Sequence, residues 1–402
     1  MLSFHEARAR LLARATRLET ERVPLASALG RVLAEPVLAP WDLPPFSYSA
    51  MDGYAFRSET LVGSGPFRLP VLGESRTGTP PVPLVAGTAA RIFTGAELPA
   101  GADSVVAQED VEVREGAIEL GSAPRFGQHV RRAGEDLERG NVALRAGKRL
   151  GAAALALLSS IDQTEVAVAR RPRVTVLATG DELRPVGAPP KAGTIPDSLS
   201  LPLGALANAA GADVRIAPFV RDEAAATEAA IAAGLRGTDL LVTIGGVSVG
   251  DHDRVRPALE ASGVVLDFWK VAIKPGKPLA SGAHPSSGVL VLSLPGNPSS
   301  ALVTFSLFGV PLLRALQGDE NPLPRTAFLP LAAAYRKKAG RLEIVRAALE
   351  EDPHGARVRP LDNQASGALT SLAWADAFAL IPADVESLEA GASVQIVRFQ
   401  DL

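Results

Sequence analysis

The chain has 402 residues, a formal net charge of −3 and no cysteine. This length predicts two to four domains, each with its own hydrophobic core. The small net charge gives no overall attraction to nucleic acid or to an anionic membrane surface. The absence of cysteine excludes disulfides, thiolate zinc sites and a cysteine nucleophile, and it fits a cytoplasmic protein.

No segment is typical of a signal peptide or of a membrane span. Residues 1–20 carry charges throughout and have no apolar centre, so we predict no secretory signal. The most apolar later stretches, 151–161 and 301–313, are too short or too interrupted by polar residues and Pro311 to cross a bilayer. We therefore expect a soluble protein without a membrane partner.

The N-terminal residues predict an elongated domain that is interrupted by a second domain. A helix is expected over residues 3–16, where Ser3 and Glu6 match a capping box, and a second helix over residues 26–33. A further helix over residues 151–160 is expected to return to the first element. Residues 1–43 and 148–170 are thus predicted to form one elongated N-terminal domain.

Residues 44–147 contain short apolar runs separated by glycine and proline, which predicts an inserted, small antiparallel β domain. The Asp52-Gly53 pair is a turn signal. Two other polar loops of this region carry Thr94 and Asp136. An Asp-Gly pair is most often only a turn, so this pair by itself is weak support for a site.

From residue 171 to residue 320 the pattern alternates strand with helix, which predicts an α/β domain whose parallel sheet has helices on both faces. The expected strands cover residues 174–179, 213–220, 240–244, 264–268 and 289–294; the expected helices cover 199–210, 223–235, 253–261 and the residues after 299. Polar loops follow several of these strands, namely TGDEL (179–183), RDE (221–223), GGVSVGDHD (245–253) and LPGNP (294–298). Ligands of such sheets bind at the carboxyl ends of the strands, so these loops predict a site.

The residue types in these loops suit an anionic ligand and a hard cation. Glycines allow positive φ angles and bring bare backbone amides against an anion, while nearby lysines add positive charge. Carboxylates offer oxygen atoms to a cation such as Mg²⁺. Each motif also has a purely structural interpretation: acidic residues stabilise helix N-termini, lysines sit on surface turns, and LPGNP can simply begin a helix.

Several classes of chemistry are excluded or disfavoured. The sequence has no GxxxxGK[ST] motif and no GxGxxG motif after a strand, and its five histidines have no metal-ligand spacing. The segment GVSVG matches the GxSxG pattern, but acidic residues follow it instead of an apolar helix, which disfavours a serine hydrolase. Carboxylates, lysines and glycine loops remain, which is equipment for phosphoanhydride or oxyanion chemistry with Mg²⁺.

Residues 321–402 contain short strand-like runs after the linker GDENPLPR. They predict a compact C-terminal β domain, either a barrel or a sandwich.

Seven motifs together resemble the molybdopterin molybdotransferase family, which is related to the E domain of gephyrin. In chain order they are SAMDGYA, RIFTGAELPAGADSVVAQED, GEDL, TGDEL, GGVSVGD, FWKVAIKPGKP and LPGNPSSALVTF. The resemblance implies the last step of molybdenum cofactor synthesis: molybdate is inserted into adenylylated molybdopterin, and the phosphoanhydride is cleaved with Mg²⁺ to release AMP and the cofactor. It also implies a homodimer with a composite active site, and a molybdopterin adenylyltransferase as a possible partner.

Matching these motifs position by position gives the expected site residues. The candidate catalytic residues are Asp52, Thr94, Asp136, Glu182, Asp222, Asp253, Lys270 and Lys274. The candidate cofactor-binding residues are Thr179, Gly180, Gly245, Gly246, Ser248, Gly250, Pro295, Gly296, Asn297, Pro298 and Ser371. The expected magnesium ligands are Glu182, Asp222 and Asp253.

The chain departs from the family pattern at three positions. Leu199 stands where the family usually has Asn, which puts one polar ligand contact in doubt. Ile344 and Ala377 replace a common aromatic and a common Gly in the C-terminal domain. Two alternatives stay open, an adenylyltransferase of molybdopterin and a non-enzymatic scaffold. The inserted β domain with MDGYA and the C-terminal β domain argue against the first, and the lack of a long linker or second catalytic domain in the sequence argues against the second.

Overall fold

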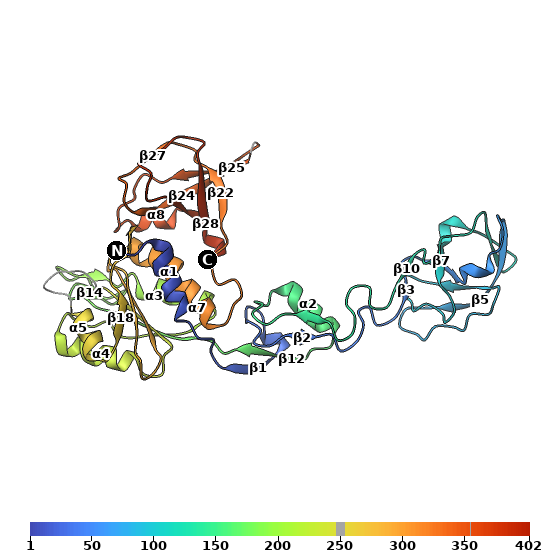
Figure 1. Ribbon diagram of the computed structural model, residues 1–402, viewed down its shortest axis with the longest axis horizontal. Helices are drawn as coiled ribbons and strands as arrows, with labels where there is room; N and C mark the ends of the chain where they lie inside the picture. The colour runs from blue at the N-terminus through green and yellow to red at the C-terminus, as the bar shows by residue number, and fades with distance from the viewer. Residues whose placement is uncertain (247–253, 354) are drawn as a thin grey trace.

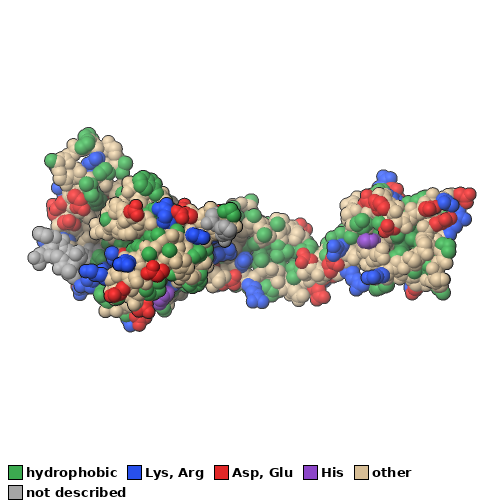
Figure 2. All heavy atoms as spheres, turned by 90° about the horizontal axis from the view of Figure 1, so that it is seen from above, with side chains coloured by type: hydrophobic (Ala, Val, Ile, Leu, Met, Phe, Trp, Pro, Cys, Tyr) green, Lys and Arg blue, Asp and Glu red, His purple; other side chains and the backbone are tan. Residues whose placement is uncertain are grey.

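The computed structural model describes residues 1–246, 254–353 and 355–402, and it is markedly elongated (Figure 1). A large α/β sheet and a C-terminal β structure lie together at one end, and a separate β sheet forms the other end. A narrow ribbon of paired strands connects the two ends. Seen from above, acidic and basic side chains are interspersed along this face (Figure 2).

The first helix confirms the predicted capping box but not the expected neighbours. In α1 (Phe4–Ala13), the Ser3 hydroxyl accepts from the Glu6 amide, and the Glu6 carboxylate accepts from the Ser3 amide. The ring of Phe4 packs edge-on against Phe308, with 5.2 Å between centroids. The buried face of α1 thus belongs to the core of the α/β sheet. Residues 1–43 were expected to lie in the elongated domain, so this part of the prediction differs from the structure. The other domain boundaries stay a prediction.

The connecting ribbon consists of antiparallel strand pairs with one covering helix. β1 pairs with β12 and β2 with β11, and α2 packs beside them; the bounds are β1 Thr20–Pro24, β2 Val37–Leu38, β11 Val142–Leu144, β12 Glu165–Ala169 and α2 Ala152–Ser160. The helix expected over residues 26–33 is wrong, because only η1 (Leu25–Ser27) is helical. Val32 and Leu33 instead make strand-like bridges to Arg149 and Val168, so tertiary pairing overrides local helix propensity.

The distal sheet has the order β7-β4-β6-β5-β9-β8. Its bounds are β4 Gly53–Phe56, β5 Phe67–Ser75, β6 Ala89–Ile92, β7 Ser104–Ala107, β8 Glu112–Arg114 and β9 Ala117–Leu120, with η2 Ser58–Thr60 and η3 Gln108–Asp110. The expected purely antiparallel arrangement is wrong at one place, since β5 and β6 are parallel. A small pair, β3 (Tyr48–Ser49) with β10 (Val130–Arg131), joins this sheet to the ribbon.

The α/β sheet has the order β16-β13-β17-β21-β20-β18 and helices on both faces, as predicted. Its strands are β13 Arg173–Ala178, β16 Asp213–Ile216, β17 Leu240–Ile244, β18 Val265–Phe268, β20 Ala280–Ala283 and β21 Leu290–Leu294. Its helices are α3 Ser200–Ala209, α4 Ala224–Gly234, α5 Val255–Ala261, α6 Pro298–Thr304 and α7 Val310–Leu316. A short parallel pair, β14 (Leu183–Arg184) with β15 (Ile195–Pro196), lies beside it.

The sheet is not parallel throughout, because β20 is antiparallel to both of its neighbours, β18 and β21. β18 therefore runs in the same direction as β21 without being paired to it. The carboxyl ends of β13, β17, β18 and β21 consequently lie at one edge of the sheet, which is where the polar loops begin.

Residues Pro298–Leu316 form one apolar helical run of 19 residues, long and apolar enough to cross a membrane by length and composition. Most of this run is buried inside the protein, against α1 and the sheet, as is typical of a core helix. This stretch of the sequence was expected to be too short or too interrupted, by polar residues and Pro311, to cross a bilayer; by length and composition it is not, and the helix continues through Pro311. A π-helical turn, η4 (Phe305–Gly309), precedes α7 and lets the helix continue through the proline.

The C-terminal residues form a sheet with the order β19-β24-β26-β28-β22, to which β25 adds by pairing with β24. The bounds are β19 Ile273–Lys274, β22 Ala327–Pro330, β24 Leu342–Asp352, β25 Gly355–Pro360, β26 Ala377–Ile381 and β28 Ser393–Arg398, with β23 Tyr335–Arg336, β27 Ser387–Leu388, α8 Leu369–Ala373 and η5 Phe399–Asp401. A bridge between Leu331 and Val358 joins the end of β22 to β25. This bridge closes the sheet toward a barrel, one of the two expected forms.

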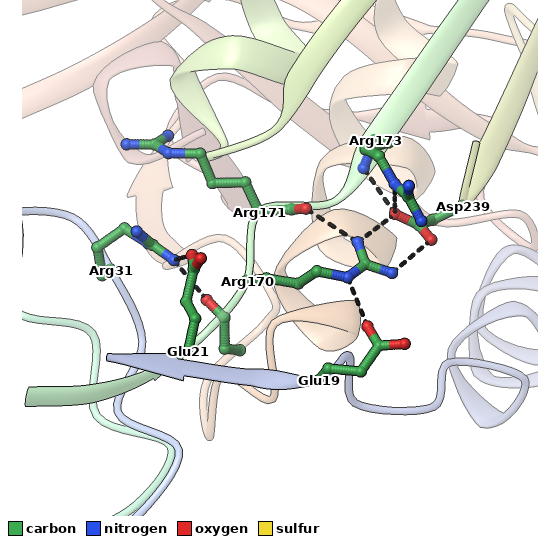
Figure 3. Close-up of polar contacts among 8 residues, drawn as sticks. Glu19, Glu21, Arg31, Arg170, Arg171, Arg173 and Asp239 are labelled. Carbon is green, nitrogen blue, oxygen red and sulfur yellow. Dashed lines mark hydrogen bonds and ion pairs between the residues drawn. The ribbon is translucent and has the colours of Figure 1, made fainter. Parts of the chain in front are cut away.

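A cluster of ion pairs fastens the ribbon to the α/β sheet (Figure 3). Arg170, directly after β12, binds both carboxylate oxygens of Asp239 at 2.6 and 2.8 Å and also pairs with Glu19. The Arg173 amide donates to the same Asp239 carboxylate at 2.7 Å. Because Asp239 directly precedes β17, this cluster fixes the ribbon to a central strand of the sheet.

Candidate active site at the carboxyl edge of the α/β sheet

A cavity of about 470 Å³ lies at the carboxyl ends of β13, β17 and β21. Its walls come from loops that are far apart in sequence. The lining residues are Ala178, Thr179, Gly180, Glu182, Leu183, Ile195, Pro196, Asp197, Ser198, Leu199, Asp222, Ile244, Gly245, Gly246, Pro278, Pro295, Gly296, Asn297 and Pro298. The position agrees with the general rule for ligand sites of such sheets.

Glycines allow the loop backbones to meet closely at the floor of this cavity. Gly245 has a φ of +85°, and a Cβ atom there would lie 2.7 Å from the Thr179 carbonyl oxygen. A Cβ on Gly246, with a φ of +59°, would lie 2.4 Å from the Val255 side chain. Any side chain at these positions would push the loops apart, so the close backbone approach depends on glycine.

Carboxylates line one side of the cavity. Glu182 folds back over its own loop, such that a Cβ on Gly180 would lie 2.5 Å from its Oε2 atom. The amide of Asp222 donates to the Asp181 Oδ1 atom at 3.2 Å, which ties two of the strand-end loops together. Both Glu182 and Asp222 were predicted as site residues, and the structure brings them into one cavity.

Asp197 is a further carboxylate of the lining that was not among the expected site residues. Its Oδ1 atom accepts from the amides of Leu199 and Ser200, both at 3.0 Å, and so caps the start of α3. The available signal was the Asp-Ser pair directly before an expected helix. Leu199, the departure noted in the sequence, also lines the cavity, with only 5% of its surface exposed.

The donor set of the cavity fits Mg²⁺ in type but is incomplete in number. The lining offers carboxylate oxygens and contains no histidine, which suits a hard cation. Within the part of the chain that the structure describes, no group of three His, Cys, Asp or Glu side chains forms a metal site. Mg²⁺ commonly binds through one or two carboxylates plus ligand phosphates, so Glu182 and Asp222 match that mode.

The predicted residues that line the cavity come from all four of the expected polar loops; they are Thr179, Gly180, Glu182, Asp222, Gly245, Gly246, Pro295, Gly296, Asn297 and Pro298. Ser248, Gly250 and Asp253 lie outside the described residues. The part of the predicted magnesium site that involves Asp253 therefore stays a prediction.

The structure does not bring the remaining α/β and C-terminal candidates into this cavity. Lys274 pairs with Glu343 at 2.6 Å and lies in a separate hollow, and Lys270 is half-buried after β18. Ser371 is buried in α8, where its hydroxyl donates to the Ala368 carbonyl at 3.3 Å. Among the described lining residues there is no lysine or arginine, so the expected basic contacts are absent from this wall.

Asp52, Thr94 and Asp136 lie with the distal sheet and the strands leading to it, at the other end of the molecule (Figure 1). The amide and hydroxyl of Thr94 both donate to Asp52 Oδ1 at 2.8 Å. These hydrogen bonds lower the pKa of the Asp52 carboxyl, which is thereby held ionised. Asp136 is exposed, and its amide donates to the Leu43 carbonyl at 3.0 Å. One chain therefore presents two separated groups of candidate residues.

Comparison with known proteins accounts for almost the whole chain. Residues 2–161 match the MoeA N-terminal region (domains I and II), residues 175–315 a probable molybdopterin binding domain, and residues 329–399 the MoeA C-terminal region (domain IV). A molybdopterin molybdenumtransferase of Haemophilus influenzae is 37% identical over 100% of both chains. The chain belongs to the molybdopterin molybdenumtransferase family.

Other members of the molybdopterin molybdenumtransferase family are also similar to this chain over nearly its whole length. The protein of that name from Synechococcus elongatus is 39% identical over 98% of this chain and 99% of its own. Crystal structures of molybdopterin biosynthesis MoeA proteins from Pyrococcus horikoshii match over 99% of this chain, one with 33% identity and a TM-score of 0.82, another with 27% and 0.87. The resemblance predicted from seven motifs, the fold class and the assignment to the transferases are thus confirmed.

Proposed function

We propose that this chain inserts molybdate into adenylylated molybdopterin and cleaves the phosphoanhydride, releasing AMP and molybdenum cofactor. Family membership over the full length supports the overall reaction. The observation that carries the proposal in this molecule is the cavity at the sheet edge, where glycine backbones and the Glu182 and Asp222 carboxylates meet. A pterin joined to a nucleotide is a large anionic substrate that requires such a converging site.

Each group of the cavity has a proposed task. The backbone at Gly245, Gly246 and Gly296 approaches the anionic part of the substrate without steric hindrance. Glu182 and Asp222 orient a water molecule toward the phosphoanhydride and hold the cation. Mg²⁺ bound there would neutralise the phosphate charge during cleavage of the P–O bond. Lys270 and Lys274 are proposed to hold anionic oxygens, and Ser371 and Asp253 to complete the site.

The distal residues Asp52, Thr94 and Asp136 are proposed to join the cavity of a second copy of the chain. Support comes from their distance along the elongated molecule (Figure 1), which leaves them without a route to the cavity of their own chain. A homodimer with a two-fold axis would bring each distal group to the partner's cavity. We also propose a cytoplasmic location and a molybdopterin adenylyltransferase as the enzyme that supplies the substrate.

The direct test gives the purified protein adenylylated molybdopterin, Mg²⁺ and molybdate, without ATP. The proposal expects molybdate-dependent release of AMP together with cofactor that activates an apo-molybdoenzyme. AMP release that does not depend on molybdate would contradict it, as would adenylylation of molybdopterin in a parallel assay that supplies ATP and molybdopterin instead. Omission of Mg²⁺ or of molybdate provides the matched control.

A further inference from the structure

A second hollow, of about 420 Å³, is strongly basic. We call it the basic pocket; it is lined by Lys274, Arg336, Lys337, Lys338, Ala339, Arg341 and Glu343. Except for Lys274, these residues belong to β23, to the turn between β23 and β24, and to the start of β24. Five cationic side chains thus meet one carboxylate in a concave surface, although the whole chain has a net charge of −3.

The turn that carries these cations is held in place by hydrogen bonds. Lys337 directs its ammonium group inward, where it donates to the Arg341 carbonyl at 3.0 Å. The amides of Lys337 and Gly340 donate to the Glu386 and Ala383 carbonyls at 2.8 and 2.7 Å. Lys337 is therefore a structural residue that helps to hold the turn in place.

The single carboxylate of the basic pocket is already occupied. Glu343 has only 6% of its side chain exposed and pairs with Lys274 at 2.6 Å. Burial and the neighbouring Glu343 carboxylate raise the pKa of the Tyr335 hydroxyl, which therefore stays neutral. The negative charge of Glu343 is thus paired with Lys274 and does not neutralise the cations of the turn.

Three cations of the basic pocket have no acidic partner within the described ranges. Arg336 and Lys338 are exposed and Arg341 is half-buried, and none of the three takes part in an ion pair among residues 1–246, 254–353 and 355–402. Like charges held close together repel one another. A multiply charged anion bound between them would remove this repulsion and form charge-assisted hydrogen bonds.

The basic pocket is connected to the candidate active site by one short segment. Residues 275–277 link Lys274, which lines the basic pocket, to Pro278, which lines the cavity. The described lining of that cavity holds Glu182, Asp197 and Asp222 and no lysine or arginine. An anionic substrate therefore finds positive charge beside the cavity rather than along its described wall.

We propose that Arg336, Lys338 and Arg341 form a binding site for a tetrahedral oxyanion group. The volume and concave shape fit a compact, multiply charged group. Under the proposed function, the group is either the free oxyanion substrate or a phosphate of the nucleotide part of the organic substrate, and the two share the same chemistry. Bound there, the anion is retained next to the cavity before reaction.

Equilibrium binding with the full-length protein tests this site with tungstate, inorganic phosphate and AMP as separate probes. We expect saturable binding of at least one probe that weakens with added salt, and a loss of roughly tenfold or more in affinity in the triple variant Arg336→Gln, Lys338→Gln, Arg341→Gln. Binding of tungstate displaced by phosphate would identify a free oxyanion, whereas binding of AMP alone would identify a substrate phosphate.

Two further variants keep the test decisive. Lys338→Gln changes one exposed side chain that forms no ion pair among the described residues, so it reports on binding even if the triple variant unfolds. Arg325→Gln removes an exposed cation outside the basic pocket and should bind like the wild type. Absence of binding of all three probes, or unchanged affinity in the triple variant, would overturn the proposal.

Binding and turnover are measured separately, so the two proposals can fail separately. Wild-type protein that binds an oxyanion at the basic pocket but releases no AMP would remove the proposed function and leave this site. Protein that releases AMP, but whose anion affinity is unchanged in the triple variant, would remove this site and leave the proposed function.

Discussion

At the scale of single residues, the candidate active site depends on a few carboxylate side chains. We expect that an uncharged side chain of the same size cannot replace them. Glu182 and Asp222 bring carboxylates into a cavity that is also lined by closely packed glycine loops. Asp52 is far away, but its carboxyl is also held in one orientation by both donors of Thr94. Charge and orientation, rather than apolar contact, are what these residues contribute.

Replacing Glu182 by Gln keeps the size of the side chain and removes its charge. If this carboxylate orients water and binds the cation, the rate of AMP release should fall by about 100-fold or more. Steady-state AMP release by the variant and the wild type measures this. Glu228→Gln, an exposed position of α4, is the matched control and should keep full activity. An undiminished rate in Glu182→Gln would refute the assignment.

Substituting Gly245 tests whether the close backbone approach is needed. In Gly245→Ala the added Cβ would meet the Thr179 carbonyl at 2.7 Å in a left-handed conformation. We expect a loss of about 2 kcal/mol or more in the free energy of unfolding, together with weaker binding of AMP. Gly237→Ala, with a φ of +66° and no atom within 4 Å of the new Cβ, isolates the backbone strain at about 1 kcal/mol. Equal losses in the two variants would show that the contact with Thr179 is unimportant.

Part of this site could be predicted from residue order and part could not. The TGDEL and LPGNP loops follow long apolar strands, and their meeting at one sheet edge follows from parallel topology. Asp197 was not predicted as a site residue, because a short Asp-Ser pair is common at helix starts and does not by itself indicate a ligand site. Lys274 was expected in the cavity, but its partner Glu343 is distant in sequence and buried in the C-terminal barrel, so no local pattern signals the pairing.

At the scale of elements, continuous apolar strands were easy to predict and tertiary pairing was not. The strands 174–179 and 240–244 correspond closely to β13 and β17, because buried parallel strands are uninterrupted apolar runs. β20 (Ala280–Ala283) was missed, since its residues are small and have weak strand propensity. Its presence reverses one strand of the sheet and still leaves the polar loops at the same edge.

The ion cluster of Figure 3 should stabilise the junction between the ribbon and the α/β sheet. Burial would raise the pKa of Asp239, but hydrogen bonds from Arg170 and from the Arg173 amide outweigh burial and lower it. Asp239→Asn leaves Arg170 without its main partner, so we expect a loss of about 3 kcal/mol at neutral pH. Urea unfolding at pH 7 measures it, with Glu165→Gln, an exposed ion-pair partner of Arg22, as a control worth less than about 1 kcal/mol.

The difference in unfolding free energy between the wild type and Asp239→Asn should depend on pH. The ordinary pKa of Asp239 is 3.8 and the folded value is lower, so its contribution is fully present above pH 3.8 and is lost as pH falls through the folded pKa. The difference in stability between wild type and Asp239→Asn should therefore be constant from about pH 5 to about pH 8 and shrink in acid. A difference that grows in acid would contradict the assigned role.

At the scale of the whole molecule, the elongated form separates two groups of candidate residues that the motifs predict to act together. Asp52 and Thr94 lie by the distal sheet, and Glu182 and Asp222 lie at the α/β sheet (Figure 1). The sequence predicted both groups, but it contains no measure of the distance between them within one chain. A two-fold partner would reverse the direction of the second molecule and place the unlike ends together.

The central claim is that the cavity of one protomer and the Asp52 loop of another make one catalytic centre, and mixing two inactive variants tests it most directly. Asp52→Ala and Glu182→Ala should each be inactive alone. After unfolding and refolding together, half of the dimers should be mixed and each should hold one intact site, which restores about a quarter of wild-type AMP release. Recovery to about that level is the predicted result. Full activity of Asp52→Ala alone, or no recovery in mixed dimers shown to have formed, would contradict the shared centre.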